Sequence, residues 1–228
     1  MKVGLIVECT PSGMESTVCP KLITLLAHET GQPIELHAVR TMTNKKLLIN
    51  DAADAAKILL SEGCDRIVIL WDENPPWSPD KDFSDHRCWH IERQQLIENL
   101  HAAKVDSKKI RLVCIEREFE TWLLHDDSLL SAVVSTPAHL YKVGKIKKPL
   151  TVDDPKAALQ NIFRDNHRTF NPDIAAIQFA KQIETLDRLK RCDTFRYFVE
   201  AVLGNMPTGW PPFTYKPKGA RLKGKKNK

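Results

Sequence analysis

Residues 66–74 read Arg-Ile-Val-Ile-Leu-Trp-Asp-Glu-Asn (RIVILWDEN) and give the clearest indication of the fold class. Residues 67–71 are apolar throughout and rich in β-branched side chains, without the alternation of a half-exposed strand. That pattern predicts a strand buried on both faces, as in parallel sheets that carry helices on either side. The acidic residues that follow at once would then stand at the carboxyl end of this strand.

Apolar runs and helical stretches alternate on both sides of this strand. We expect three further strands, at residues 3–7, 34–39 and 110–115. We expect helices between the strands at about 16–29, 51–63 and 85–103, with Pro20 in the first turn of one helix and Gly63 closing another. Helical crossovers of this length imply parallel strands joined by right-handed connections. The sequence therefore predicts an α/β fold with a four-stranded, mainly parallel sheet flanked by helices.

The pattern changes after residue 115. We expect a short helix over 117–125, a polar connector with the basic stretch 142–148 (KVGKIKK), and helices at 155–165, 172–190 and 193–203. No flexible linker precedes these helices, so we expect them to pack on the same core. The prediction is an α/β domain over 1–133, a helical extension over 134–205 and a basic tail over 206–228.

The net charge of +5 comes from the end of the chain. Seven basic residues and no acidic residue lie between Lys216 and Lys228, which leaves 27 basic and 29 acidic residues elsewhere. Such a tail either stays solvated and disordered or binds phosphates of nucleic acid. The second interpretation names these candidate nucleic-acid-binding residues: Lys142, Lys145, Lys147, Lys148, Arg221, Lys223, Lys225 and Lys226.

Several classes of protein are excluded or disfavoured by what the sequence contains. Its six cysteines form no Cys-x-x-Cys pair, which is typical of reduced, cytoplasmic proteins. No window approaches 18 apolar residues without charge, and the first apolar run is too short for a secretory signal. The glycine-rich phosphate loops of nucleotide-binding proteins and the Gly-x-Ser-x-Gly turn of α/β hydrolases are missing.

Acidic residues follow three of the four predicted strands. Glu8 follows the first strand, Asp72-Glu73-Asn74 the third, and Glu116, Glu118 and Glu120 the fourth. Carboxylates that meet at one edge of a sheet repel one another unless a cation lies between them, and hard oxygen ligands suit Mg²⁺ or Mn²⁺. Such an ion promotes phosphodiester or phosphoryl transfer. The alternative is that these side chains only cap turns and helices.

The same residues resemble the Toprim domain, which topoisomerases, bacterial primases and overcoming-lysogenization-defect nucleases share. An acidic residue closing the first strand, an Asp-x-Asp closing the third and acids after the fourth carry the resemblance. More narrowly, Glu118-Phe-Glu120-Thr-Trp122-Leu-Leu-His-Asp126 resembles the E-x-E-x-W-L-L-x-D signature of a bacterial family of uncharacterised Toprim-like proteins. Leu186-Asp187 and Arg191-Cys192-Asp-Thr-Phe195 resemble its helical region.

The resemblance implies a metal-dependent nuclease that acts on DNA or RNA with Mg²⁺ or Mn²⁺. It implies catalytic roles for Glu8, Asp72 and Glu120. It implies metal ligands among Glu8, Asp72, Asn74, Glu118 and Glu120. Related proteins are often encoded beside an ATPase in phage-defence modules, so the resemblance also implies an ATPase partner and a role in antiviral defence.

Two residues depart from the Toprim pattern. Cys9 stands where a glycine normally follows the first acidic residue, and Asn74 replaces the second carboxylate of Asp-x-Asp. An amide can donate an oxygen to Mg²⁺ but brings no charge, which weakens the expected site. Two alternatives therefore stay open. The first is a degenerate module that binds nucleic acid or a partner ATPase without chemistry, and the second is another α/β sheet whose carboxylates are caps.

Overall fold

The computed structural model describes residues 1–73 and 88–211. It contains a four-stranded sheet with the order β2-β1-β3-β4, in which every neighbouring pair is parallel. The strands are β1 (Lys2–Val7), β2 (Glu35–Thr41), β3 (Arg66–Asp72) and β4 (Ile110–Ile115). The predicted α/β fold is confirmed, and the four predicted strands agree with the observed ones to within two residues at each end.

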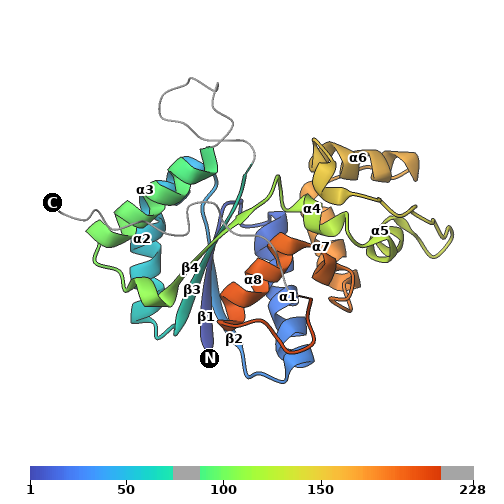
Figure 1. The fold of residues 1–228 in the computed structure, drawn as a ribbon. Helices are drawn as coiled ribbons and strands as arrows, with labels where there is room; N and C mark the ends of the chain where they lie inside the picture. The colour runs from blue at the N-terminus through green and yellow to red at the C-terminus, as the bar shows by residue number, and fades with distance from the viewer. Residues whose placement is uncertain (74–87, 212–228) are drawn as a thin grey trace.

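Helices cover both faces of the sheet (Figure 1). The crossovers are α1 (Met14–Thr30), α2 (Lys45–Ser61) and α3 (Cys88–Ala102), with the 3-10 helix η1 (Ser107–Lys109) before β4. Helices α2 and α3 pack together on one face, whereas α1 lies on the other face together with the last helix, α8 (Asp193–Leu203). From β1 the chain goes to β2 on one side and later to β3 and β4 on the other side, so the topological switch point lies between β1 and β3. Open α/β sheets bind ligands beside the carboxyl ends of the strands at such a switch point.

Strand residues alternate between two hydrophobic cores, one on each face. In β3, Val68 and Leu70 belong to the core on the α1 face, whereas Ile67, Ile69 and Trp71 belong to the core beneath α2 and α3. Strands β1 and β4 alternate in the same way. This period of two is the geometry of an extended chain, and burial on both faces is what the unbroken apolar runs predict.

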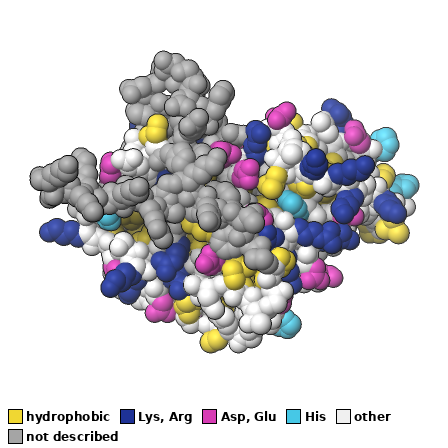
Figure 2. All heavy atoms as spheres, viewed as in Figure 1, with side chains coloured by type: hydrophobic (Ala, Val, Ile, Leu, Met, Phe, Trp, Pro, Cys, Tyr) yellow, Lys and Arg dark blue, Asp and Glu magenta, His cyan; other side chains and the backbone are white. Residues whose placement is uncertain are grey.

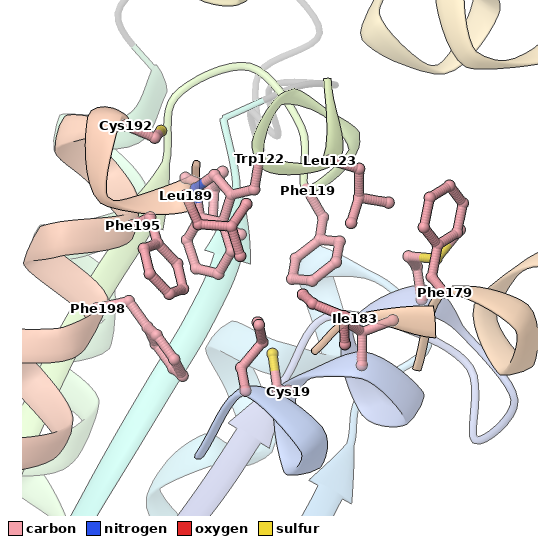
Figure 3. Close-up of a cluster of buried hydrophobic side chains, with 14 of the residues drawn as sticks. Cys19, Phe119, Trp122, Leu123, Phe179, Ile183, Leu189, Cys192, Phe195 and Phe198 are labelled. Carbon is pink, nitrogen blue, oxygen red and sulfur yellow. The ribbon is translucent and has the colours of Figure 1, made fainter. Parts of the chain in front are cut away.

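The remaining helices extend the core on the α1 face. They are α4 (Glu120–Leu123), α5 (Asp127–Val134), α6 (Pro155–Asp165) and α7 (Pro172–Gln182), with the 3-10 helix η2 (Pro149–Thr151) between α5 and α6 and the 3-10 helix η3 (Leu189–Arg191) between α7 and α8. Their apolar side chains share one cluster with β1, β3 and β4. Figure 3 shows Trp122 of α4 among Phe119, Phe195 and Phe198, and Trp122 lies with its ring centre 5.2 Å from that of Phe195.

Several predicted helix boundaries were wrong. Helix α2 begins at Lys45 rather than 51, because Asn44 caps it by accepting the amide N–H of Leu47. Helix α1 begins at Met14, so Pro20 lies in its second turn rather than its first. Helix α7 ends at Gln182, where the backbone becomes extended, and not at residue 190. Helix α5, which the Asp126 side chain caps by accepting the amide N–H of Leu129, was not predicted from the sequence.

The described helices carry no candidate membrane span. Within residues 1–73 and 88–211, every helix is either too short or too polar to cross a bilayer.

Candidate metal and phosphate site

The strands that end in acidic residues are neighbours in the sheet. Strands β1, β3 and β4 lie side by side, and β2, which is not followed by an acid, is at the edge. The ladder continues past the strand ends, because the amide of Glu8 donates to Leu70 O at 3.1 Å and the amide of Glu73 donates to Ile115 O at 2.9 Å. Parallel strands therefore deliver Glu8, Asp72 and Glu116 to one edge of the sheet, as predicted from the sequence.

Asp72 is electrostatically central among the acidic residues. Burial raises its pKa well above the usual range, and the carboxylates of Glu15, Glu120, Glu8 and Glu118 raise it further. A buried carboxylate loses hydration, and like charges nearby also disfavour its ionised form. We refer to Glu8, Glu15, Asp72, Glu118 and Glu120 as the acidic cluster. Its members are close enough to influence one another without any bound ion.

Two members of the acidic cluster have buried oxygens without a hydrogen-bond partner. Among the described residues, these are Oε2 of Glu8 and Oδ1 of Asp72. Burial raises the pKa of Glu8 to about 8, although the nearby Lys45 opposes this shift. Buried polar atoms are nearly always paired with a protein group, a water molecule or an ion. These two oxygens therefore need a proton or a cation.

Glu15 belongs to the acidic cluster, although it was not predicted from the sequence. It lies in the first turn of α1, is buried, and has a pKa raised to about 7, first by burial and also by the charge of Glu120. One signal could have identified it. The helix that follows β1 begins at the carboxyl edge of a parallel sheet, so an acidic residue in its first turn lies beside the strand ends.

Glu118 and Glu120 enter the cluster from the start of α4. Glu120 is buried, and burial raises its pKa. Glu118 is also partly buried with a raised pKa, and its Oε2 accepts the amide N–H of Lys156 at 3.2 Å. The exposed Lys156 lowers the pKa of Glu15, Glu118 and Glu120, which places this cation at the rim of the cluster. Nothing in the sequence pattern singled out Lys156.

The acidic cluster is not a finished coordination sphere. Within the part of the chain that the structure describes, no three His, Cys, Asp or Glu side chains are arranged to hold a metal ion. The strand register gives a physical reason. Val7 lies opposite Leu70, so the position opposite Glu8 is that of Trp71, and Asp72 comes one residue later. Because side chains alternate along a strand, Glu8 and Asp72 favour opposite faces of the sheet.

A buried ion pair supports the Glu8 side of the cluster. Lys45 Nζ lies 3.3 Å from Glu92 Oε1 and donates to Glu73 O at 2.8 Å, while Trp71 Nε1 donates to Glu92 Oε2 at 3.0 Å. Lys45 and Glu92 are almost fully buried. The pair therefore ties α2 and α3 to the end of β3 and keeps a positive charge beside Glu8.

Cys9 does not occupy a conformation that requires glycine. Its backbone φ is not positive, and burial raises the pKa of its thiol to about 12, so it stays protonated. The position in this loop that excludes a side chain is Gly13, where a Cβ would lie 2.8 Å from Cys9 Cβ and 3.0 Å from Thr10 O. The close packing of this loop therefore requires a glycine at position 13 and not at position 9.

The predicted basic residues divide into a described and an undescribed set. Lys142, Lys145, Lys147 and Lys148 are all exposed, and they precede η2, which packs beside α4. Lys and Arg side chains gather on the surface over α5 and α6 (Figure 2). Asn74 and the tail residues Arg221, Lys223, Lys225 and Lys226 lie outside the described residues.

Comparison of the chain with protein-family models, with curated proteins and with solved structures found no match. The Toprim resemblance therefore remains a hypothesis carried by the residues quoted for it. Any function has to be argued from the acidic cluster and the cations at its rim.

Proposed function

We propose that the chain is a Mg²⁺- or Mn²⁺-dependent nuclease that hydrolyses phosphodiester bonds at the acidic cluster. The convergence of five carboxylates with raised pKa values on the carboxyl edge of β1, β3 and β4 is the observation that carries this proposal. Carboxylates held together against their repulsion and desolvation are expected where a function needs them. The same edge is where open α/β sheets bind ligands.

The residues present suit a hard divalent cation. The unpartnered oxygen of Asp72 supplies an anionic ligand, and Glu15 or Glu120 can complete the set; Glu8, which favours the other face of the sheet, remains a proposed ligand. Asn74 and Glu118 remain proposed ligands. A bound Mg²⁺ would stabilise negative charge on the phosphate and acidify a water molecule. Because Mg²⁺ keeps several waters and takes one or two carboxylates, an incomplete protein set does not exclude it.

The side chains around the cluster would divide the remaining tasks. Glu8, whose pKa burial raises to about 8, would accept a proton from attacking water in its ionised form. Asp72 and Glu120 would hold the reacting centre. The exposed lysines at 142, 145, 147 and 148, together with the basic tail, would bind the phosphate backbone of DNA or RNA.

Cleavage of labelled DNA and RNA with Mg²⁺ or Mn²⁺ tests the proposal. We expect cleavage by the wild type and its loss with EDTA, and a fall of at least about 100-fold in Asp72→Asn and Glu120→Gln. The matched control is Asp51→Asn, which removes an exposed carboxylate from α2. Cleavage at the wild-type rate in Asp72→Asn would contradict the proposal, provided that the variant unfolds with the wild-type cooperativity.

A second candidate function is a binding module without chemistry. It is favoured by the observation that no three of the described acidic, His or Cys side chains are arranged to hold an ion. Such a module would bind nucleic acid through its basic residues or associate with a partner ATPase in phage defence, as the Toprim resemblance implies. Salt-dependent binding of nucleic acid without cleavage, both alone and with the ATPase, would favour this function over hydrolysis.

A further inference from the structure

The backbone of Arg117 adopts a left-handed conformation at the end of β4. Three non-glycine residues in the described chain have positive φ: Lys104 at 58°, Arg117 at 69° and His167 at 56°. The amide of Lys104 donates to His101 O after α3, and that of His167 donates to Arg164 O after α6. A left-handed residue at a helix end is a common way to stop a helix. Arg117 follows a strand, so helix termination does not explain its conformation.

Glu73 holds this conformation in place. The amide of Arg117 donates to Glu73 Oε2 at 3.1 Å, and the amide of Glu73 donates to Ile115 O at 2.9 Å. Two bonds thus fasten the turn after β4 to the end of β3. Strained backbone that its surroundings enforce is concentrated at functional sites.

The guanidinium of Arg117 lies at the rim of the acidic cluster. Its Nη2 is 3.8 Å from Asp153 Oδ1, and Asp153 is three residues before Lys156, whose amide binds Glu118. The Asp153 side chain is 97% exposed, so this pair is weak and easily exchanged. Arg117 therefore directly precedes Glu118 of the acidic cluster and pairs with Asp153, which follows η2, while the basic stretch 142–148 leads into η2 beside α4.

We propose that Arg117 binds a backbone phosphate of nucleic acid where the strand passes from the basic stretch to the acidic cluster. This inference deepens the proposed function and rests on it. A phosphate that approaches several carboxylates is repelled unless a fixed cation accompanies it. The guanidinium fork can donate two parallel hydrogen bonds to one phosphate, which a lysine cannot do. The enforced backbone conformation would pre-position that fork.

The test compares Arg117→Gly with Lys104→Gly. Both variants remove one positive charge and relieve one left-handed residue. Lys104 follows α3 and precedes β4, which places it at the opposite, amino-terminal edge of the sheet. Binding of a short fluorescein-labelled DNA duplex is measured by anisotropy in EDTA at several salt concentrations, and Tm is measured for each variant.

We expect Arg117→Gly to weaken binding about tenfold near 0.1 M salt and to lower the salt slope by about 0.9. Lys104→Gly should bind like the wild type. Neither variant should have a lower Tm, because glycine adopts positive φ without strain. Arg117→Ala should lose binding equally, which assigns the effect to the side chain. Binding of Arg117→Gly within twofold of Lys104→Gly would overturn the inference.

The two proposals fail in different ways. A wild type that binds but never cleaves, with binding that depends on Arg117, removes the hydrolytic function and supports the phosphate contact. A wild type that cleaves, with Arg117→Gly binding normally, keeps the nuclease and overturns the contact. A wild type that does not bind the duplex overturns the contact as well.

Discussion

The indole Nε1 of Trp122 donates a 2.8 Å hydrogen bond to Oγ1 of Thr194, and both side chains are fully buried. The bond joins the short helix α4 to the start of α8, 72 residues further along the chain. Cys192 Sγ lies 3.3 Å from the same hydroxyl. The Glu-x-Glu-x-Trp segment and the Cys-x-Thr-Phe segment therefore form one packed unit, which holds Glu120 at the edge of the sheet.

Replacing Thr194 by valine should destabilise the protein by about 1–3 kcal/mol, because the buried indole N–H loses its acceptor. Urea unfolding at neutral pH measures the change. Thr185→Val is the matched control, since Thr185 is exposed and outside regular structure, and it should change stability by less than about 0.5 kcal/mol. Equal effects of the two substitutions would show that the hydrogen bond contributes nothing.

The buried pair of Lys45 and Glu92 makes a second prediction. Lys45→Met should destabilise the fold by about 3–5 kcal/mol, because it removes the Lys45 cation from the buried Glu92 carboxylate. Adding Glu92→Gln removes the carboxylate charge while keeping an acceptor for the Trp71 indole, so the double variant should recover much of the loss. A double-mutant cycle in urea gives the coupling. Additive losses would contradict a buried ion pair.

The metal-free protein should lose stability as pH rises from 6.5 to 8.5. Glu8 has a folded-state pKa of about 8 against an ordinary value of 4.5, so in this range the folded chain keeps a proton that the unfolded chain has already released. Unfolding with EDTA at several pH values measures the slope. Glu8→Gln should make the slope shallower, while the raised pKa values of Asp72 and of Glu15, about 7, leave a remainder.

Above pH 6.5 this measurement avoids the opposite contribution of His125. Burial lowers the pKa of His125 to about 4, so stability from this residue is lost as pH falls below its ordinary value of 6.5. Buried thiols with raised pKa, such as Cys9, add a slope of their own above about pH 8. The difference between wild type and Glu8→Gln isolates the carboxylate. Identical slopes would contradict the raised pKa of Glu8.

The basic stretch 142–148 should govern the affinity for nucleic acid. Replacing Lys142, Lys145, Lys147 and Lys148 by glutamine should reduce the salt slope of duplex binding by up to about 3–4, since each phosphate contact contributes about 0.9. The control replaces four exposed lysines elsewhere, at positions 57, 104, 108 and 109. If the control variant shows an equal reduction in the salt slope of duplex binding, the effect comes from net charge in general and the prediction is wrong.

The sheet could be predicted from the sequence because strands buried on both faces leave an unmistakable pattern. Residues 67–71 are apolar on both faces, and the two cores that receive them are both present. Helix ends were harder to predict. The cap at Asn44 lies seven residues before the expected start of α2, and α5 is only eight residues long and packs against α7.

The acidic edge was also predictable, but its composition was only partly so. Topology alone places Glu8 and Asp72 at one edge, whereas Glu15, Lys45 and Lys156 enter through the way α1, α2 and α6 pack against that edge. The left-handed backbone of Arg117 could not be predicted from the sequence, because arginine rarely adopts positive φ and nothing in the sequence marks this position as an exception. Tertiary contacts, rather than spacing, decide these positions.

The most direct test of the acidic cluster is a crystal structure with Mn²⁺, located by its anomalous scattering. We expect a peak at the carboxyl edge, in contact with Asp72 and at least one of Glu8, Glu15 or Glu120, and loss of that peak in Asp72→Asn. If millimolar Mn²⁺ leaves this edge empty, or if the peak persists unchanged in Asp72→Asn, the acidic cluster is not a metal site.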